Sequence, residues 1–193
     1  IKTLSQSISD MVVKNQGMMF VLSSPSGAGK TTIGRALLDH LRPRVPAIFL
    51  LDGDEFRAAM GNDLGYSAAE RCENGLRIAR TCKLLESQDI TVICCAATIQ
   101  EDVQSFNFEN LDEYHQVAIE VSMKTLRQRD TKDIYCMASK GMMVNVVGVD
   151  MKYEFPKTQH LVLNNDDTKE SFEDLVRDIV QYVNRDVRTK SDA

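Results

Sequence analysis

The hydrophobic positions of this chain fall into short apolar runs that alternate with longer stretches of helical spacing. Such runs, bounded by turn residues, are typical of buried strands in a parallel sheet. Five of them are present: Met18–Leu22, Ala47–Leu51, Ile90–Cys95, Val117–Val121 and Leu161–Leu163. Strands that alternate with helices predict βαβ units. We therefore predict a three-layer α/β/α fold with a mainly parallel, five-stranded sheet.

Three helices are predicted between and after these strands. Residues Thr31–Leu41 place apolar side chains at helical spacing, and a last helix is expected over about residues 169–183. A third helix begins after Ser67, because Ser67 and Glu70 have the spacing of a capping box. In parallel sheets of this kind, ligands bind beyond the carboxyl ends of the strands.

No internal repeat or linker divides the 193 residues. This length suits a single domain with one substantial core. We expect an N-terminal lead-in over residues 1–17, the domain itself over 18–187 and a short tail over 188–193.

Composition argues against two kinds of partner, nucleic acids and membranes. The balance of 43% hydrophobic and 26% charged residues is that of an ordinary globular domain, and the net charge of −5 argues against a nucleic-acid partner. No apolar stretch has the length of a membrane span, so no membrane partner is expected. The five cysteines lack metal-ligand spacing, which predicts free thiols and a cytoplasmic location.

A glycine-rich turn follows the first predicted strand. Residues 24–31 match the phosphate-loop pattern G-x-x-x-x-G-K-[ST] at every fixed position except the first, where Ser24 replaces glycine. Backbone N–H groups of such a turn converge on phosphates, the lysine contacts the β and γ oxygens, and the hydroxyl of the next residue binds Mg²⁺. The alternative is an ordinary Gly/Ser loop, but the strand before it and the helix after it favour phosphate binding. The predicted ATP ligands here are Ser26, Gly27, Ala28, Gly29, Lys30, Thr31 and Thr32.

Two carboxylates stand at the end of the second predicted strand, which we expect to lie beside the first. Asp52 and Asp54 flank Gly53, so both can face the cleft. We predict that Asp54 is the base for the attacking hydroxyl and that Asp52 binds Mg²⁺ through water, although the two roles could be exchanged. Alone, Asp-Gly-Asp would indicate only a tight turn. With Lys30, these aspartates form the predicted catalytic set.

Two classes of nucleotide-binding protein are disfavoured because their motifs are missing. The third predicted strand ends at Cys95 and continues with Ala96 and Ala97 rather than with an aspartate, which disfavours ATPases that depend on a Walker B carboxylate. The chain also has no N-K-x-D sequence, which disfavours a GTPase.

Taken together, the motifs resemble those of adenylylsulfate (APS) kinases, a family of P-loop kinases. The family carries the phosphate loop, then L-D-G-D, L-G-[FY]-S, D/E-R with E-N on a helix, and R-D-x-K-x-x-Y. The corresponding residues here are Leu51-Asp52-Gly53-Asp54, Leu64-Gly65-Tyr66-Ser67, Glu70-Arg71, Glu73-Asn74 and Arg129-Asp130-Thr131-Lys132-Asp133-Ile134-Tyr135. Residues 145–149 and 153–156 also resemble the closing segment of that family. The resemblance covers about residues 18–165 in the family's order.

This resemblance implies a phosphotransferase that moves the γ-phosphoryl group of ATP to the 3′-hydroxyl of adenylylsulfate, with Mg²⁺ as cofactor, in a homodimer. It places Lys132 in a lid over about residues 130–150 and Tyr66 against the base of the acceptor. Arg129 is either a cation of the ATP site or a salt-bridged helix end. Without the motif, Arg71 and Asn74 would indicate only a solvated helix face. The expected acceptor-site residues are Asp54, Arg57, Tyr66, Arg71, Asn74, Ala97, Thr98 and Lys132.

The chain departs from the family pattern around the expected acceptor site. Residues 97–99 replace I-S-P, and residues 107–110 lack the arginine of N-R-E-N. In the lid, Asp133 replaces a glycine, while Cys136 and Met137 replace basic residues. Fewer cations weaken the recognition of a doubly anionic acceptor.

Three hypotheses therefore follow from the sequence. Adenylylsulfate leads as the acceptor, and a cytidine-diphosphate-type precursor of a polysaccharide is the alternative. A nucleotide-binding regulatory protein without catalysis is the hypothesis of another class. Guanylate kinase shares a similar phosphate loop, but the later motifs favour the APS kinases.

Overall fold

A computed structural model describes residues 17–97, 100–130, 132–152, 161–166 and 172–191. Five strands form one sheet, and every pairing between them is parallel, which confirms the predicted fold class. The order across the sheet is β2-β3-β1-β4-β5. The strands are β1 (Met19–Ser23), β2 (Ile48–Asp52), β3 (Thr91–Cys95), β4 (Tyr114–Glu120) and β5 (Leu161–Asn164).

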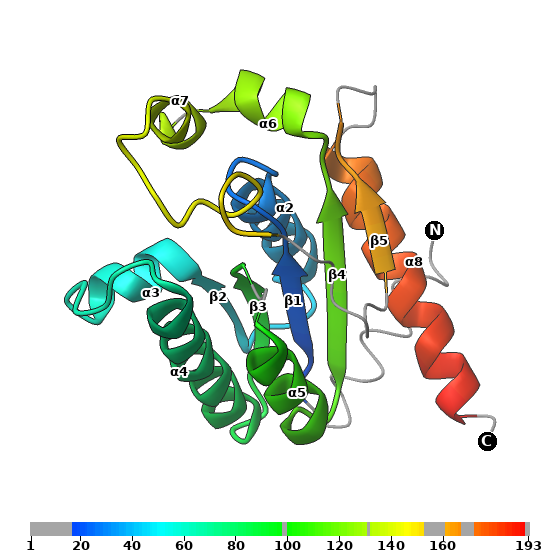
Figure 1. Ribbon diagram of the computed structural model, residues 1–193. Coiled ribbons are helices and arrows are strands. Elements are labelled where there is room, and N and C mark those ends of the chain that lie inside the picture. The colour runs from blue at the N-terminus through cyan, green and yellow to red at the C-terminus, as the bar shows by residue number, and fades with distance from the viewer. Residues whose placement is uncertain (1–16, 98–99, 131, 153–160, 167–171, 192–193) are drawn as a thin grey trace.

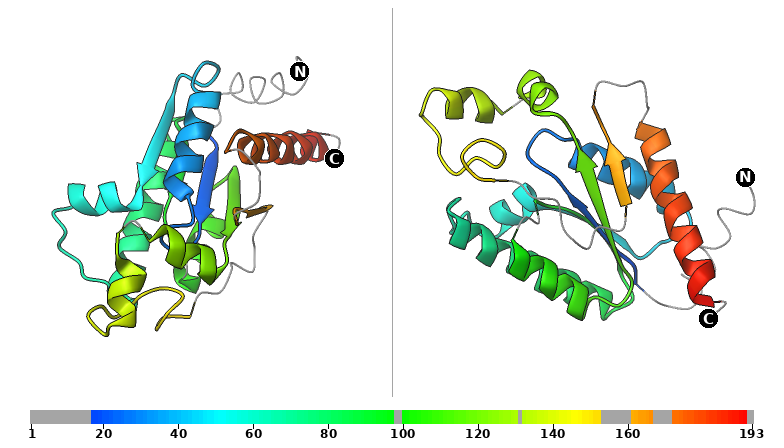
Figure 2. Two further views of the ribbon diagram at one scale, coloured as in Figure 1. Left: turned by 90° about the horizontal axis from the view of Figure 1, so that it is seen from above. Right: turned by 45° about the vertical axis from the view of Figure 1, so that its right-hand side comes forward.

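Helices cover both faces of the sheet. Figures 1 and 2 show α2 and α8 on one face and α4 and α5 on the other, while α3 follows the end of β2 and α6 and α7 stand above the carboxyl ends of the strands. The helices are α2 (Lys30–Leu41), α3 (Gly53–Ala59), α4 (Ala68–Glu86), α5 (Glu101–Asn110), α6 (Met123–Arg129), α7 (Ile134–Ser139) and α8 (Phe172–Ser191).

The central strand β1 is buried on both faces, as its continuous apolar run predicted. Phe20 and Leu22 belong to the cluster that includes Leu37 of α2 and Ile179 of α8. Met19 and Val21 belong to a second cluster on the other face of the sheet, with residues of α4. Each such buried side chain contributes about 1.5–3 kcal/mol of transfer free energy. The phosphate loop that follows β1 is therefore attached to the best-packed part of the fold.

One expectation about the sheet was wrong. The second strand does not lie beside the first, because β3 pairs with both β1 and β2 and separates them. The chain thus runs from the central strand β1 to the edge strand β2 and returns to β3, which lies between them. The carboxyl ends of β1 and β2 nevertheless lie at the same edge of the sheet, because both strands pair in parallel with β3 and their ends are level with Cys95.

The local predictions differ from the structure mainly in helices. The Asp-Gly-Asp segment is not a tight turn, because Gly53 is the first residue of α3 and Asp52 is its N-cap. Helix α8 (Phe172–Ser191) extends beyond the predicted end at about residue 183, while the predicted start at about residue 169 lies outside the described residues. The capping box of α4 is confirmed: the Ser67 hydroxyl accepts from the Glu70 N–H, and the Glu70 carboxylate accepts from the Ser67 N–H.

Two predictions drawn from composition can be checked directly. All five cysteines are free thiols, three of them buried. None of the helices in the described ranges is long and apolar enough to cross a lipid bilayer.

Candidate active site

A cleft of about 1180 Å³ runs along the carboxyl ends of the strands. Most of the predicted site residues line it. On the phosphate-loop side these are Ser26, Gly27, Gly29, Lys30, Thr31, Thr32 and Arg129. On the other side they are Asp52, Asp54, Arg57, Tyr66, Arg71, Asn74, Ala97 and Lys132. Ala28 is buried in the loop behind them, and Thr98 lies outside the described residues.

The phosphate loop is held in shape by two glycines and by a residue from the far end of the chain. Gly27 and Gly29 have φ angles of 79° and 95°, a region that side chains disfavour. The side-chain amide of Asn165, just after β5, donates to the Ala28 carbonyl at 2.9 Å. A Cβ at Gly29 would lie only 2.7 Å from that amide nitrogen. Asn165, which the sequence analysis did not select, therefore fixes the loop from the side.

Lys30 lies at the mouth of the loop and is half-buried. Its Nζ donates to the carbonyl oxygens of Ser24, at 2.9 Å, and Pro25, at 2.8 Å. Burial lowers the pKa of Lys30 to about 8, and the negative charges of Asp54 and Asp52 oppose this shift only in part. The ammonium group is thus a poorly solvated charge that phosphate oxygens would stabilise.

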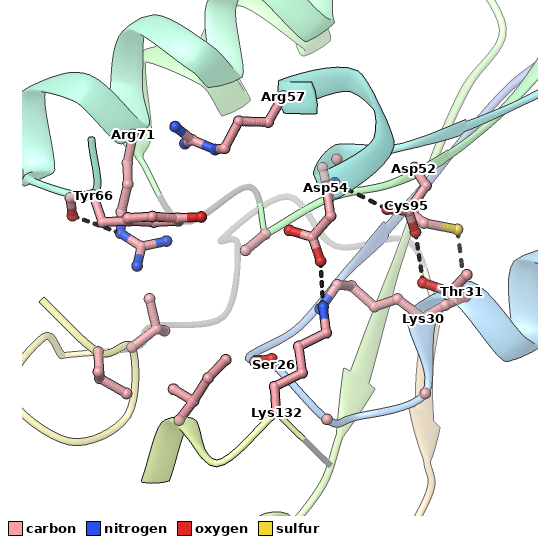
Figure 3. Close-up of a pocket in the computed structure, with 18 of the residues that line it drawn as sticks. Ser26, Lys30, Thr31, Asp52, Asp54, Arg57, Tyr66, Arg71, Cys95 and Lys132 are labelled. Atoms are coloured by element: carbon pink, nitrogen blue, oxygen red, sulfur yellow. Dashed lines mark hydrogen bonds and ion pairs between the residues drawn. The ribbon is translucent and has the colours of Figure 1, made fainter. Parts of the chain in front are cut away.

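Asp52 and Asp54 have different environments, although they are two residues apart. The Thr31 hydroxyl donates to Asp52 Oδ2 at 2.6 Å, and Asp52 Oδ1 accepts the Asp54 N–H at 2.9 Å. Asp52 is therefore buried, engaged as the cap of α3, and fixed beside Thr31. The Asp54 side chain is 69% exposed and forms an ion pair with Lys132 of the lid (Figure 3).

Two arginines enclose an aromatic ring at the other end of the cleft. The guanidinium carbons of Arg57 and Arg71 lie 4.7 Å and 5.1 Å from the centroid of the Tyr66 ring, and Figure 3 shows the ring between them. Within the described ranges, neither guanidinium has a carboxylate at ion-pair distance. Burial lowers the pKa of Arg71, and the positive charge of Arg57 adds to this shift. An anion bound here would relieve the repulsion between the two cations.

The backbone around Tyr66 is fixed by hydrogen bonds rather than by packing alone. Arg57 donates to the carbonyls of Leu64, at 2.8 Å, and Gly65, at 3.0 Å. The Glu70 carboxylate accepts from the Gly65 N–H at 2.9 Å and from the Ser67 hydroxyl at 2.6 Å. The capping box of α4 therefore also positions Tyr66.

The lid (residues 130–150, with 131 outside the described residues) is tied to the rest of the cleft. The Tyr135 hydroxyl donates to the Ser26 carbonyl at 2.8 Å, which attaches α7 to the phosphate loop. Arg71 donates to the Asn145 carbonyl at 2.7 Å, which attaches the far part of the lid to α4. Tyr135 and Asn145 stood in matched motifs, but no property of their local sequence predicted these partners.

Asn74 and Arg129 had alternative interpretations from sequence. Asn74 is only 8% exposed and lines the cleft, so it does not belong to a solvated helix face. Arg129 lines the cleft and also lies near Asp166. The pKa of Asp166 is lowered first by the Ser122 N–H that it accepts, with a smaller effect of Arg129. Both interpretations of Arg129 thus remain compatible with its position.

The cleft offers oxygen ligands that suit Mg²⁺. The Thr31 hydroxyl and the Asp52 carboxylate lie together beneath the loop, and both are hard donors. No group of three or more His, Cys, Asp or Glu side chains in the described part of the chain could hold a metal ion alone. Mg²⁺ commonly binds through one or two protein ligands together with substrate phosphates, so these residues fit it.

A phosphate loop between β1 and α2 of a parallel sheet, with a lid above it, defines the fold of a P-loop kinase. The adenylylsulphate kinase family model matches residues 16–164. The chain therefore belongs to the adenylylsulphate kinase family, and the protein is a phosphotransferase, as the sequence predicted.

Curated relatives carry two different names. The chain is 35% identical over 153 residues to the cytidine diphosphoramidate kinase of Campylobacter jejuni, covering 79% of this chain and 89% of that protein. It is 32% identical over 168 residues to the adenylyl-sulfate kinase of Bacteroides thetaiotaomicron, covering 86% and 83%. The APS kinase of Mycobacterium tuberculosis, solved with AMPPNP and APS, superposes with a TM-score of 0.80 at 23% identity, covering 87% of this chain and 98% of the other. That last likeness supports the fold alone.

Proposed function

We propose that this protein transfers the γ-phosphoryl group of ATP to the 3′-hydroxyl of adenylylsulfate. The observation that carries the proposal is the placement of Asp54: its exposed carboxylate shares one cleft with the phosphate loop and lies close enough to Lys30 to act on its pKa. A phosphate-binding loop and an available carboxylate at one mouth are the parts that phosphoryl transfer to a hydroxyl requires.

In this mechanism the triphosphate of ATP lies along the backbone N–H groups of residues 27–31. Lys30 leaves the carbonyls of Ser24 and Pro25 and binds β and γ oxygens, where its charge stabilises the transition state. Asp54 accepts the proton of the acceptor hydroxyl while the hydroxyl oxygen bonds to the γ-phosphorus. The bond between the γ-phosphorus and the β-γ bridging oxygen breaks, and ADP leaves. Mg²⁺, when bound beside Thr31 and Asp52, neutralises charge on the phosphates.

The acceptor-binding role is proposed for the opposite end of the cleft. Arg57 and Arg71 lack carboxylate partners among the described residues, so their charges are available to the anionic group of an acceptor. Both faces of Tyr66 lie against guanidinium groups in the structure. A base that stacks on Tyr66 must therefore displace one of them. Lys132 must also exchange its contact with Asp54 before that carboxylate can take a proton.

A cytidine-diphosphate-type acceptor is the second candidate. The 35% identity to a cytidine diphosphoramidate kinase over 89% of that protein supports it. The lid also supports it, since Cys136 is exposed and Met137 half-buried where the family pattern has basic residues. The presence of Lys30 and Asp54 in one cleft argues against a purely regulatory protein.

One experiment tests these assignments. The purified protein is incubated with Mg-ATP and one candidate acceptor at a time: adenylylsulfate, cytidine diphosphoramidate, cytidine diphosphate or guanosine monophosphate. The mass of each product is measured by mass spectrometry. We expect a product heavier by one phosphoryl group with adenylylsulfate and ADP release that depends on it. A product only with the cytidine compounds would move the assignment to the second candidate. If none of these acceptors supports ADP release, both candidate functions are overturned.

Two further properties belong to the proposal. Free thiols at all five cysteines support a cytoplasmic location. A homodimer is expected from the family resemblance, and sedimentation velocity of the full chain tests it.

A further inference from the structure

The cleft extends to both edges of the sheet. At the β2 edge it is lined by α3 with Asp54, by α4 with Arg71, and by the lid. At the β5 edge it is lined by Arg129, Asn165 and Phe172. The phosphate loop lies between these two ends, because it follows the central strand β1.

The position of Asp54 fixes which end holds which substrate. If the proposed function is correct, the γ-phosphorus lies within reach of Asp54, at the β2 side of the loop. The triphosphate then follows the loop away from Asp54, and the nucleoside of ATP projects toward the β5 edge. This step rests on the proposed function, and the wall at the β5 edge is where the base of the donor must lie.

The described part of the cleft contains three aromatic side chains. Tyr66 lies at the acceptor end between two guanidinium groups. Tyr135 is buried and donates to the Ser26 carbonyl. Phe172, the first residue of α8, is 41% exposed, and its Cε1 lies 3.9 Å from where a Cβ of Gly29 would be. An exposed aromatic ring therefore stands near Gly29 of the phosphate loop, on the side of the cleft that Asn165 and β5 form.

We propose that Phe172 is the platform on which the base of ATP stacks, and hence a positioning residue for the phosphoryl donor. A half-exposed phenyl ring gains favourable contact and loses bound water when a flat base covers it. Stacking on an aromatic ring is a common way in which proteins hold nucleobases. With the base held there and the phosphates on the loop, the γ-phosphoryl group is set at a defined distance from the base.

Phe172 is not needed to hold the phosphate loop itself. Asn165 already donates to the Ala28 carbonyl at 2.9 Å and fills the space beside Gly29. Phe172 Cε1 would be only at ordinary van der Waals distance, 3.9 Å, from a Cβ at Gly29, an atom that the glycine lacks. Removing the ring should therefore leave the phosphate-binding geometry intact and affect only ligands that carry a base.

Isothermal titration calorimetry of the full chain with ADP and, separately, with inorganic tripolyphosphate tests this. We expect Phe172→Ala to weaken ADP binding about tenfold, equivalent to about 1.4 kcal/mol, with tripolyphosphate affinity unchanged. Phe172→Tyr should restore ADP binding, because it keeps the ring. Phe108→Ala is the matched control: Phe108 lies on α5, is 61% exposed and does not line the cleft, so neither affinity should change.

The possible results separate the two proposals. Equal weakening of ADP and tripolyphosphate would show that Phe172 supports the loop, and unchanged ADP binding would show that it does not hold the base. Either result overturns this inference while leaving the proposed function in place. If the wild-type protein binds neither ligand, the proposed function fails first. Should Phe172→Ala not fold, Phe172→Leu keeps apolar bulk beside Gly29 without the ring face, and the same comparison applies.

Discussion

The charge of Lys30 should make nucleotide binding depend on pH between about pH 7 and pH 9. Burial holds its pKa at about 8 in the ligand-free cleft, well below the ordinary value of 10.5. Its charged form therefore exists below pH 8 and is lost as the pH rises through 8. Phosphates bound to Nζ favour the charged form, so binding raises this pKa and takes up a proton.

The size of the effect follows from the pKa. Lys30 is about 90% protonated at pH 7 and about 10% protonated at pH 9 if its pKa is about 8. If only the charged form binds phosphate well, ADP affinity falls about tenfold between these two pH values. The other groups of the cleft with resolved shifts do not titrate here: Asp54 raises the pKa of Lys132, and burial raises those of Tyr135 and Cys95 to about 12. The terminal phosphate of ADP, with a pKa of about 6, is already about 90% ionised at pH 7.

Calorimetry of ADP binding at pH 7, 8 and 9, in buffers of different ionisation enthalpy, measures both the affinity and the protons taken up. We expect close to half a proton per ADP at pH 8. Lys30→Arg is the control, because arginine stays charged throughout and should flatten the dependence. A wild-type affinity that stays constant from pH 7 to pH 9, with no proton uptake, would refute the assignment of a neutralisable Lys30 to the phosphate site.

Three other predictions follow from the contacts of the cleft. Asp54→Ala should lower kcat at least about 100-fold with little change in melting temperature, and near-normal turnover would remove it as the base. Asn165→Ala leaves the buried Ala28 carbonyl without its donor, at about 1–3 kcal/mol, so the KM for ATP should rise about tenfold or more in steady-state assays; an unchanged KM would show that the loop holds itself. Arg71 donates to the Tyr66 carbonyl from Nε and to the Asn145 carbonyl from Nη2, and the single donor nitrogen of a lysine in Arg71→Lys cannot reproduce both positions. This substitution should raise the KM for the acceptor about tenfold and increase proteolysis of the lid, whereas a rise only in the KM for ATP would contradict the assignment.

The parts of the fold that sequence predicted are those encoded by neighbouring residues. The five apolar runs, the phosphate loop at residues 24–31 and the capping box of Ser67 and Glu70 each depend on a few consecutive positions. Asp52 as the N-cap of α3 could have been predicted in the same way, since Asp54 and Glu55 follow it in the first turn. The short helices α6 and α7 were missed because they are too brief for a clear apolar stripe.

The parts that sequence did not predict depend on topology. Asn165 and Ala28 are 137 positions apart, and Tyr135 and Ser26 are 109 apart. Which residues meet across such separations is decided by the strand order, and the position of β3 between β1 and β2 was itself predicted wrongly. The family resemblance predicted many of the residues that line the cleft, but not the hydrogen bonds that hold them in place.

The strand order places the phosphate loop and the proposed acceptor-binding residues on different elements of the cleft. The phosphate loop follows the central strand and Phe172 begins α8, whereas Arg57, Arg71 and Tyr66 are carried by α3, α4 and the turn between them. Substitutions of Arg57, Tyr66 and Arg71 are therefore expected to leave the phosphate loop in place, unlike substitutions of Asp52 or Asp54 at the start of α3. We therefore expect a change of acceptor to require substitutions at Arg57, Tyr66 and Arg71 rather than in the phosphate loop.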